Sequence, residues 1–357
     1  MKKVPLRKVK EGDILALDLY TEDFKLLLVR GTKLSFPLIT LMSNRAIKEV
    51  FIEDEHTDDV TYSPLLFHDA RKEIHKEIYR VLFQYLSQEE IGFKFNSVDL
   101  GKEFEKISRT LLNYIATQPD ILHSMHDIHV YDHYVLQHSL NVGMISGMIG
   151  LEKGLSKNEL IELMVGAMLF DIGMTKLPKH VLNKKGTFST IEKKVVQRHT
   201  MLGYEVLIKE RNISEESALC ALYHHERLDG DGYPTNLPGD AIHLYPRIVA
   251  VADVFDALTT QRHHRDQYSP HEAVEYLYAS GGTMFDTDVI KSFLKTFAVF
   301  PVGSTVKLNN GLNAVVTKVF PDFPLRPVVR ILEDTHGERL HTPIDVDLRH
   351  HHNVTIQ

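Results

Sequence analysis

The sequence predicts a mainly α-helical protein, in which a helical bundle is flanked by a small N-terminal α+β module and a C-terminal β module. Apolar residues recur at helical spacing through the middle of the chain. Towards both ends the pattern changes to short apolar runs separated by glycines and turn residues. We therefore expect four regions: a module at 1–60, a helical connector at 61–119, the main helical domain at 120–298 and a β module at 299–357.

In the N-terminal module, Gly12 and Gly31 mark turns between strand-type runs, and a short helix is expected at 36–46. The expected strands are 12–20, 26–34 and 47–54. Helical periodicity then predicts two connector helices, at 64–86 and 101–118, that carry no recognisable chemistry.

The main domain is predicted to be a series of helices, most of them preceded by a serine that can act as an N-cap. The expected helices are 133–150, 157–170, 189–207, 214–225, 245–258 and 269–280, and the expected caps are Ser156, Ser189, Ser214 and Ser269. In the last region, Asn309-Asn310-Gly311 predicts a hairpin within 304–320. Further strands are expected at 327–334 and 336–346.

The composition is that of an ordinary soluble globular protein, with 43% apolar and 25% charged residues among 357. The formal net charge of -7 argues against a nucleic-acid polymer as the ligand. The single cysteine, Cys220, excludes an internal disulfide bond and fits a reducing cytoplasm. No apolar run reaches the length of about 18 residues that a membrane span needs, and the basic start lacks the apolar core of a signal peptide. We expect a cytoplasmic protein.

Asp171 is the first residue that calls for an explanation, because it follows an apolar run, 164–170, with no cationic residue in the same helix. The helix macrodipole disfavours a negative charge at a C-terminus, and a buried unpaired carboxylate is costly. For an isolated aspartate, simple exposure at the helix end would explain the position about equally well.

Other metal-ligand residue types lie in neighbouring apolar helices. They are His138, His199, His224, His225, Asp253 and, one turn after Asp253, Asp256. A lone core histidine is usually structural, but several helices with such residues favour one shared centre of one or two metal ions. Adjacent helical residues project about 100° apart, so His224 and His225 could each serve one ion of a pair. A bridging Asp171 would then gain the cation that its position requires.

Two further segments surround this constellation. The loop after His225 alternates Asp229 and Asp231 with Gly230 and Gly232 and ends in Tyr233-Pro234, so its backbone can approach a ligand closely. After the Asp253 helix come Arg262 and Arg265, whose planar guanidinium groups suit phosphate oxygens. Alone, these segments would be an ordinary turn and a solvated loop. Beside a metal centre they indicate phosphoester hydrolysis.

At these residues the sequence resembles the HD-GYP family, bacterial metal-dependent phosphodiesterases that cleave cyclic di-GMP. The motifs "QHSLNVG", "FDIG", "RHTMLGYEVL", "HHERLDGDGYP" and "RIVAVADVFDALTTQR" carry the resemblance, and the terminal modules lie outside it. The resemblance implies an HD-type helical bundle with metal ligands His138, Asp171, His199, His224, His225 and Asp253. It gives catalytic roles to Asp171, His225 and Asp253. It also makes Gly232, Tyr233, Pro234, Arg262 and Arg265 substrate contacts.

Three positions depart from the family pattern. The family's His-Asp pair is here Phe170-Asp171, its following lysine is Met174 with Lys176 out of register, and a glutamate of some relatives is Tyr134. Phenylalanine has no donor atom and is expected to fill space in the cavity that a ligand would occupy. The first ion would keep His138, Asp171 and Asp253. The second would keep Asp171, His199, His224 and His225.

The resemblance implies a signalling hydrolase that converts cyclic di-GMP to pGpG or GMP with one or two divalent ions, iron or manganese. The loss of one ligand is expected to weaken it. Two alternatives remain: a catalytically degenerate module that binds cyclic di-GMP as a regulator, and a scaffold whose terminal modules bind proteins. Intact Tyr233, Arg262 and Arg265 favour the first two readings over a scaffold. A homodimer stays open.

Overall fold

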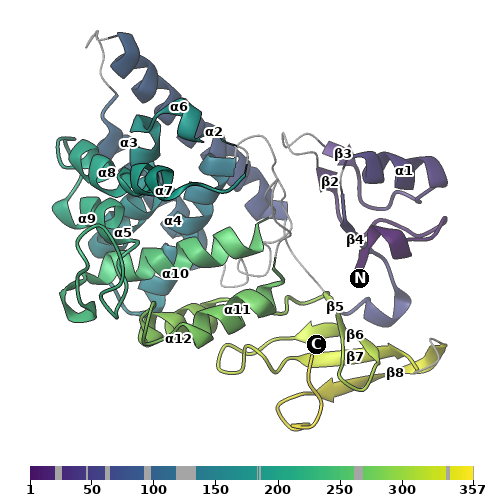
Figure 1. The fold of residues 1–357 in the computed structure, drawn as a ribbon. Helices are drawn as coiled ribbons and strands as arrows, with labels where there is room; N and C mark the ends of the chain where they lie inside the picture. Colours follow the sequence, from purple (N-terminus) through teal and green to yellow (C-terminus); the bar gives the residue numbers. More distant parts are fainter. Residues whose placement is uncertain are drawn as a thin grey trace. The chain divides into compact units, whose positions relative to one another are not determined.

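The computed structural model describes residues 1–20, 26–45, 47–60, 65–91, 98–117, 134–182, 184, 186–260, 268–334 and 338–356. They form two compact units (Figure 1). The described residues of one unit come from both ends of the chain, within 1–66 and 297–357, and those of the other from 67–121 and 133–296. None of the helices in the described ranges is long and apolar enough to cross a membrane.

The second unit is helical, as the sequence predicts, and α4 lies at its centre. Helix α4 packs against α5, α10 and α12, while α5 also contacts α3 and α9. The helices are α2 (Leu65–Ile91), α3 (Leu100–Thr117), α4 (Tyr134–Glu152), α5 (Lys157–Leu169), α6 (Lys179–Leu182), α7 (Thr190–Gln197), α8 (His199–Leu207), α9 (Glu215–Tyr223), α10 (Leu244–Thr259), α11 (Pro270–Ala279) and α12 (Thr287–Thr296), with the 3-10 turns η4 (Ile172–Lys176) and η5 (Gly239–Ala241).

Glycines allow α5 to lie close along α4. A Cβ atom added at Gly143 would lie 2.4 Å from Met168 Cγ, and one added at Gly147 would lie 2.9 Å from Met164 Sδ. Methionine side chains therefore fill the space above a smooth face of α4. This packing holds the C-terminal end of α5, which leads into Asp171, against the helix that carries His138.

The four predicted serine caps are confirmed. Ser156, Ser189, Ser214 and Ser269 each accept a hydrogen bond from a backbone N–H in the first turn of their helix. At Ser156, Ser189 and Ser269 the third helical residue is a glutamate that bonds back to the cap, which completes a capping box. These helix starts were readable because the cap is a local interaction.

The helix predicted at 189–207 is wrong in one respect, because it breaks at Arg198 into α7 and α8. Arg198 N–H donates to Val195 O, and the His199 side chain donates from Nδ1 to Val196 O at 2.6 Å. A side chain thus takes a carbonyl that a continuous helix would use. The break sets the direction of the His199 ring.

The first unit begins with two small antiparallel sheets. Strand β1 (Lys2–Pro5) pairs with β4 (Glu49–Ile52), β2 (Leu19–Tyr20) pairs with β3 (Leu26–Leu28), and α1 (Phe36–Asn44) lies between β3 and β4 in sequence. The predicted long strand at 12–20 is wrong, because only its last two residues form one. Its earlier part bonds to two segments in turn, with Leu15 N–H donating to Thr32 O and Ala16 N–H to Phe51 O. Strand β1 was not predicted.

The C-terminal part is an antiparallel four-stranded sheet in the order β5–β6–β7–β8. Its strands are β5 (Thr305–Lys307), β6 (Asn313–Lys318), β7 (Val328–Glu333) and β8 (Arg339–Asp347). The predicted hairpin is confirmed, and Gly311 takes a φ of 85° in its turn. The two ends of the chain are joined where Lys3 N–H donates to Gly303 O at 2.7 Å.

Candidate metal centre

Asp171 lies just beyond the C-terminus of α5 rather than inside it. Phe170 caps α5 and Asp171 begins η4, with no capping bond from the aspartate side chain. Its Oδ1 atom lies 3.4 Å from His199 Nε2 and 3.8 Å from His224 Nε2. The carboxylate therefore faces two of the predicted ligands.

A close contact between η4 and α8 brings Asp171 and His199 together. A Cβ atom added at Gly173 would lie 2.0 Å from His199 O and 2.5 Å from Gly203 N. Only glycine at this position lets η4 lie on the first turn of α8. In the segment "FDIG", Gly173 thus allows the close contact with α8, and this contact brings the carboxylate of Asp171 near His199.

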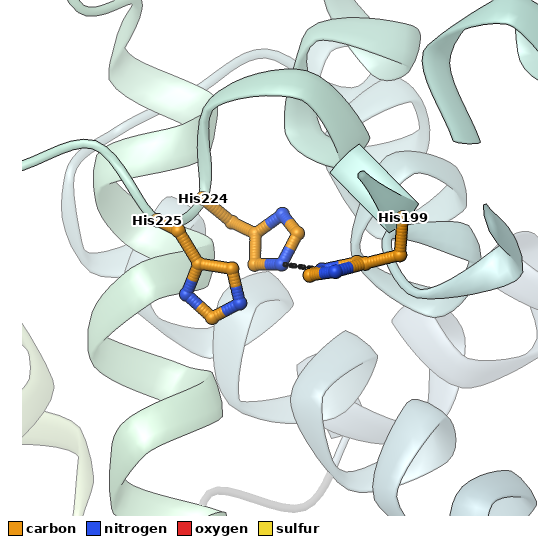
Figure 2. A group of neighbouring side chains, drawn as sticks. All are labelled: His199, His224 and His225. Atoms are coloured by element: carbon orange, nitrogen blue, oxygen red, sulfur yellow. Dashed lines mark hydrogen bonds between the residues drawn. The ribbon is translucent and has the colours of Figure 1, made fainter. Parts of the chain in front are cut away.

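His224 and His225 follow the end of α9 and turn towards His199 (Figure 2). Each of the three histidines offers a ring nitrogen, and these nitrogens all lie within 4.8 Å of one another. The sequence allowed His224 and His225 to serve one ion each or the same second ion, and their ring nitrogens lie close enough together to hold one ion with His199. Because α9 ends at Tyr223, helical spacing no longer separates their side chains, and their ring centroids are 4.1 Å apart.

The tautomers of His199 and His224 follow from their hydrogen bonds. Nδ1 of His199 bonds to Val196 O at 2.6 Å, and Nδ1 of His224 bonds to Cys220 O at 2.9 Å. A carbonyl only accepts, so each Nδ1 carries the proton and each neutral ring keeps a lone pair on Nε2. The two Nε2 atoms lie 3.3 Å apart. Two lone pairs facing each other beside a carboxylate fit a cation.

The electrostatic environment keeps His224 and His225 in the neutral, ligating form. Burial, followed by the neighbouring His225 and His199, holds the pKa of His224 well below its usual value. Burial and His199 likewise lower the pKa of His225 to about 3. Imidazole binds metal ions only when it is neutral. His199, His224 and His225 can therefore hold a metal ion, with Asp171 Oδ1 beside two of them.

A second group of predicted residues lies between α4 and α10. His138 Nε2 bonds to Asp253 Oδ1 at 2.9 Å, and Nδ1 bonds to Asp256 Oδ2 at 2.7 Å. Asn141 Nδ2 donates to Asp256 Oδ1 at 2.6 Å and fixes that carboxylate. Burial alone would lower the pKa of His138, but the hydrogen bonds to the two carboxylates outweigh it and raise the pKa to about 10.

Phe170 separates the two groups. Its side chain is fully buried. Its ring lies edge-on to His138, with centroids 5.7 Å apart, and to His224, with centroids 4.9 Å apart. The expectation that this side chain fills space among the ligands is confirmed. Met174 is half-buried in η4, and Lys176 is exposed.

The glycine-rich loop forms one wall of the centre. The Tyr233 ring lies 4.7 Å from the His225 ring, and Tyr233 N–H donates to His225 O. Burial, then the charges of Asp171 and Asp253, raise the pKa of the Tyr233 hydroxyl. Tyr233 therefore lies beside the group of His199, His224 and His225.

Two supporting residues escaped the sequence reasoning about roles. Buried Glu226 accepts hydrogen bonds from Thr235 N at 2.7 Å, Thr235 Oγ1 at 2.8 Å and Leu237 N at 3.1 Å, which holds the loop in place. Asp256 orients His138. Both residues lie next to predicted ligands in the sequence, since Glu226 follows the His pair and Asp256 lies one turn after Asp253. Their positions alone do not show whether they bind a metal ion or hold other residues in place. Arg262 and Arg265 lie outside the described residues.

Comparison with known proteins relates two regions of the chain to known domains. Residues 112–289 match the HD domain family, and residues 305–357 match a KOW domain associated with HD domains. An HDG"Y"P protein from Bdellovibrio bacteriovorus shares the fold, with a TM-score of 0.52 over 82% of this chain and 97% of that chain at 14% identity. The helical unit is thus an HD domain.

Several curated proteins with similar sequences are named as phosphodiesterases of cyclic dinucleotides. The cyclic di-GMP phosphodiesterase response regulator RpfG of Xanthomonas campestris is 41% identical over 42% of this chain and 40% of its own length. A cyclic di-GMP phosphodiesterase of Pseudomonas aeruginosa is 32% identical over 64% of this chain and 54% of its own length. A 3'3'-cGAMP-specific phosphodiesterase of Vibrio cholerae is 28% identical over 59% of this chain and 39% of its own length. The chain is an HD-domain protein over residues 112–289, and it spans about half, or less, of the length of these relatives.

Proposed function

We propose that this protein is a metal-dependent phosphodiesterase that hydrolyses cyclic di-GMP to pGpG or GMP. The observation that carries the proposal is the close group of His199, His224 and His225, with Asp171 Oδ1 beside the first two and their Nε2 atoms 3.3 Å apart. In the neutral tautomers set by the carbonyls of Val196 and Cys220, both facing Nε2 atoms are acceptors, which a cation would satisfy. The names of the relatives supply the substrate class.

The metal ligands are drawn from His138, Asp171, His199, His224, His225 and Asp253, and iron or manganese is the ion we propose. When bound, a divalent ion supplies Lewis-acid activation of water and of the phosphodiester. Asp171, His225 and Asp253 are the residues that we propose would hold the ion and act at the reacting phosphodiester. The backbone carbonyls of Val196 and Cys220 keep His199 and His224 in the ligating tautomer.

The substrate would lie against the Gly232-Tyr233-Pro234 wall. A Cβ atom at Gly232 would lie 2.4 Å from Arg227 N, so the loop folds back tightly and presents Tyr233 to the centre. Arg262 and Arg265 are proposed to bind phosphate oxygens, on the strength of their position in the motif.

The main alternative is a degenerate module that binds the nucleotide without turnover. Phe170 and Met174 motivate it, because each replaces a polar residue of the family pattern. The intact converging ligands and the named enzyme relatives support the enzyme over this alternative.

The test is a hydrolysis assay on anaerobically purified protein. We expect linear product from cyclic di-GMP, loss of turnover on chelation, and recovery with added iron or manganese. Faster turnover of 3'3'-cGAMP would move the proposal to that substrate. Binding of cyclic di-GMP by metal-loaded protein without any product would establish the degenerate module instead.

A further inference from the structure

We infer that this metal centre holds a single ion, bound by His199, His224, His225 and Asp171, and that Phe170 closes the second ion position beside His138. The inference rests on the proposed function, since it concerns the same centre. It departs from the pair of ions that the sequence allowed.

Phe170 occupies the space between the two groups of ligands. Its ring is fully buried and edge-on to both His138 and His224, one ligand from each group. An aromatic edge carries C–H groups and no lone pair. The space between the two groups is therefore filled by a side chain that cannot ligate, and water cannot replace it without a cavity being opened.

The two groups of ligands differ in how their ring nitrogens are bonded. On the His138 side, both ring nitrogens already have carboxylate partners, Asp256 at 2.7 Å and Asp253 at 2.9 Å. On the His199 side, two Nε2 lone pairs face each other at 3.3 Å and have Asp171 Oδ1 at 3.4 Å and 3.8 Å. The His138 group is satisfied by hydrogen bonds, whereas the facing Nε2 atoms of His199 and His224 offer two lone pairs to a cation.

The two sides of Phe170 also differ in the number of side chains that can bind a metal ion. Catalytic metal sites in proteins keep about three protein ligands. The His199 side offers four side chains. Without a histidine at position 170, the His138 side offers His138 and Asp253, and it reaches three only if Asp171 bridges. Among the described residues, His199, His224 and His225 form a mutually close group of ligands, and Asp171 Oδ1 lies near two of them.

Metal content measured by mass spectrometry on the full chain, purified anaerobically and loaded with iron or manganese, tests the inference. We expect about one equivalent per chain in the wild type, and a loss of about tenfold or more in His199→Ala and Asp171→Ala. His138→Ala should keep its single ion. Phe170→His should approach two equivalents, while Phe170→Leu, a ligand-free control, should stay at one. Two equivalents in the wild type, or loss of the ion in His138→Ala, would overturn the inference.

A second readout avoids variants that fold poorly. In the wild type loaded with Mn(II), electron paramagnetic resonance should show an isolated ion, and in Phe170→His an exchange-coupled pair. Coupling in the wild type would refute the single ion. The two proposals fail separately: an enzyme with two ions keeps the function and loses the inference, whereas an inactive protein with one ion does the opposite.

Discussion

Phe170 is the residue that separates this chain from the family pattern, and it is also a core side chain. Its ring is fully buried between His138 and His224, so its role in packing can be measured apart from metal binding. The sequence predicted that position 170 points among the ligands. It could not predict that the ring contacts a ligand on each side, because contacts between α4, α5 and α9 depend on the tertiary fold.

Truncation of Phe170 should therefore destabilise the fold. Phe170→Ala is expected to lower the free energy of unfolding by about 3–5 kcal/mol, because it leaves a cavity as well as losing buried area. Ile191→Ala on α7, whose side chain is 77% exposed, should change it by less than about 0.5 kcal/mol. Urea denaturation of metal-free protein measures both. Equal, small effects would show that Phe170 is not packed as described.

At the scale of the element, the tight turn η4 is what carries Asp171 to His199. A Cβ atom at Gly173 would lie 2.0 Å from His199 O, a clash with backbone that cannot move aside. Gly173→Ala should therefore displace η4 from α8, lower the unfolding temperature and weaken metal binding in titrations. Gly203→Ala, whose added carbon would meet Ala221 Cβ at 3.2 Å, should have the milder effect. A larger effect of Gly203→Ala than of Gly173→Ala on the unfolding temperature and on metal binding would contradict this packing.

The loop that carries Tyr233 depends on one buried carboxylate. Glu226 accepts from Thr235 N, Thr235 Oγ1 and Leu237 N. Glu226→Ala should cost about 1–3 kcal/mol of unfolding free energy, since it leaves these donors without an acceptor, and should speed hydrogen exchange at the Thr235 and Leu237 amides. Asp231→Asn, exposed in the same loop, is the matched control. Unchanged exchange in Glu226→Ala would remove Glu226 as the anchor.

Helices were the elements that the sequence predicted best. Their periodicity and serine caps are local, so α5, α9 and α11 follow from nearby residues alone. The break at Arg198 could not be predicted in this way, because it depends on the hydrogen bond from the His199 side chain to the Val196 carbonyl. Strand β1 was missed for a related reason: its partner β4 is distant in sequence, and its short lysine-rich segment has no strand pattern of its own.

At the scale of the whole molecule, the chain ends form one compact unit and the HD domain another. No periodicity in the sequence pairs the first strand with the segment at Gly303, because that contact spans most of the chain. Arg330 on β7 ties the same ends together. It bonds to Asp345 from β8, to Asp59 and to His56 O. The prediction that the terminal modules bind proteins stays a prediction.

Loss of Arg330 should weaken this unit alone. Its side chain is only 13% exposed, so Arg330→Ala is expected to cost about 1.5–3 kcal/mol through its charge-assisted hydrogen bonds. Hydrogen exchange should rise in β6–β8 and β1 and stay unchanged in α4 and α5. Lys291→Ala, which breaks an exposed ion pair on α12, should change neither the free energy of unfolding nor the hydrogen exchange of these strands. Faster exchange in α4 after Arg330→Ala would contradict the division into two units.

The central claim is that the histidine cluster binds the metal with which this protein hydrolyses a cyclic dinucleotide. Its most direct test is the turnover of saturating cyclic di-GMP by metal-loaded wild type, His224→Ala and His350→Ala. His224 is buried at the centre, whereas His350 is 76% exposed and far from it in the sequence. We predict pGpG or GMP from the wild type and His350→Ala, and from His224→Ala only the rate of metal-free protein. Equal turnover in all three proteins would contradict the account.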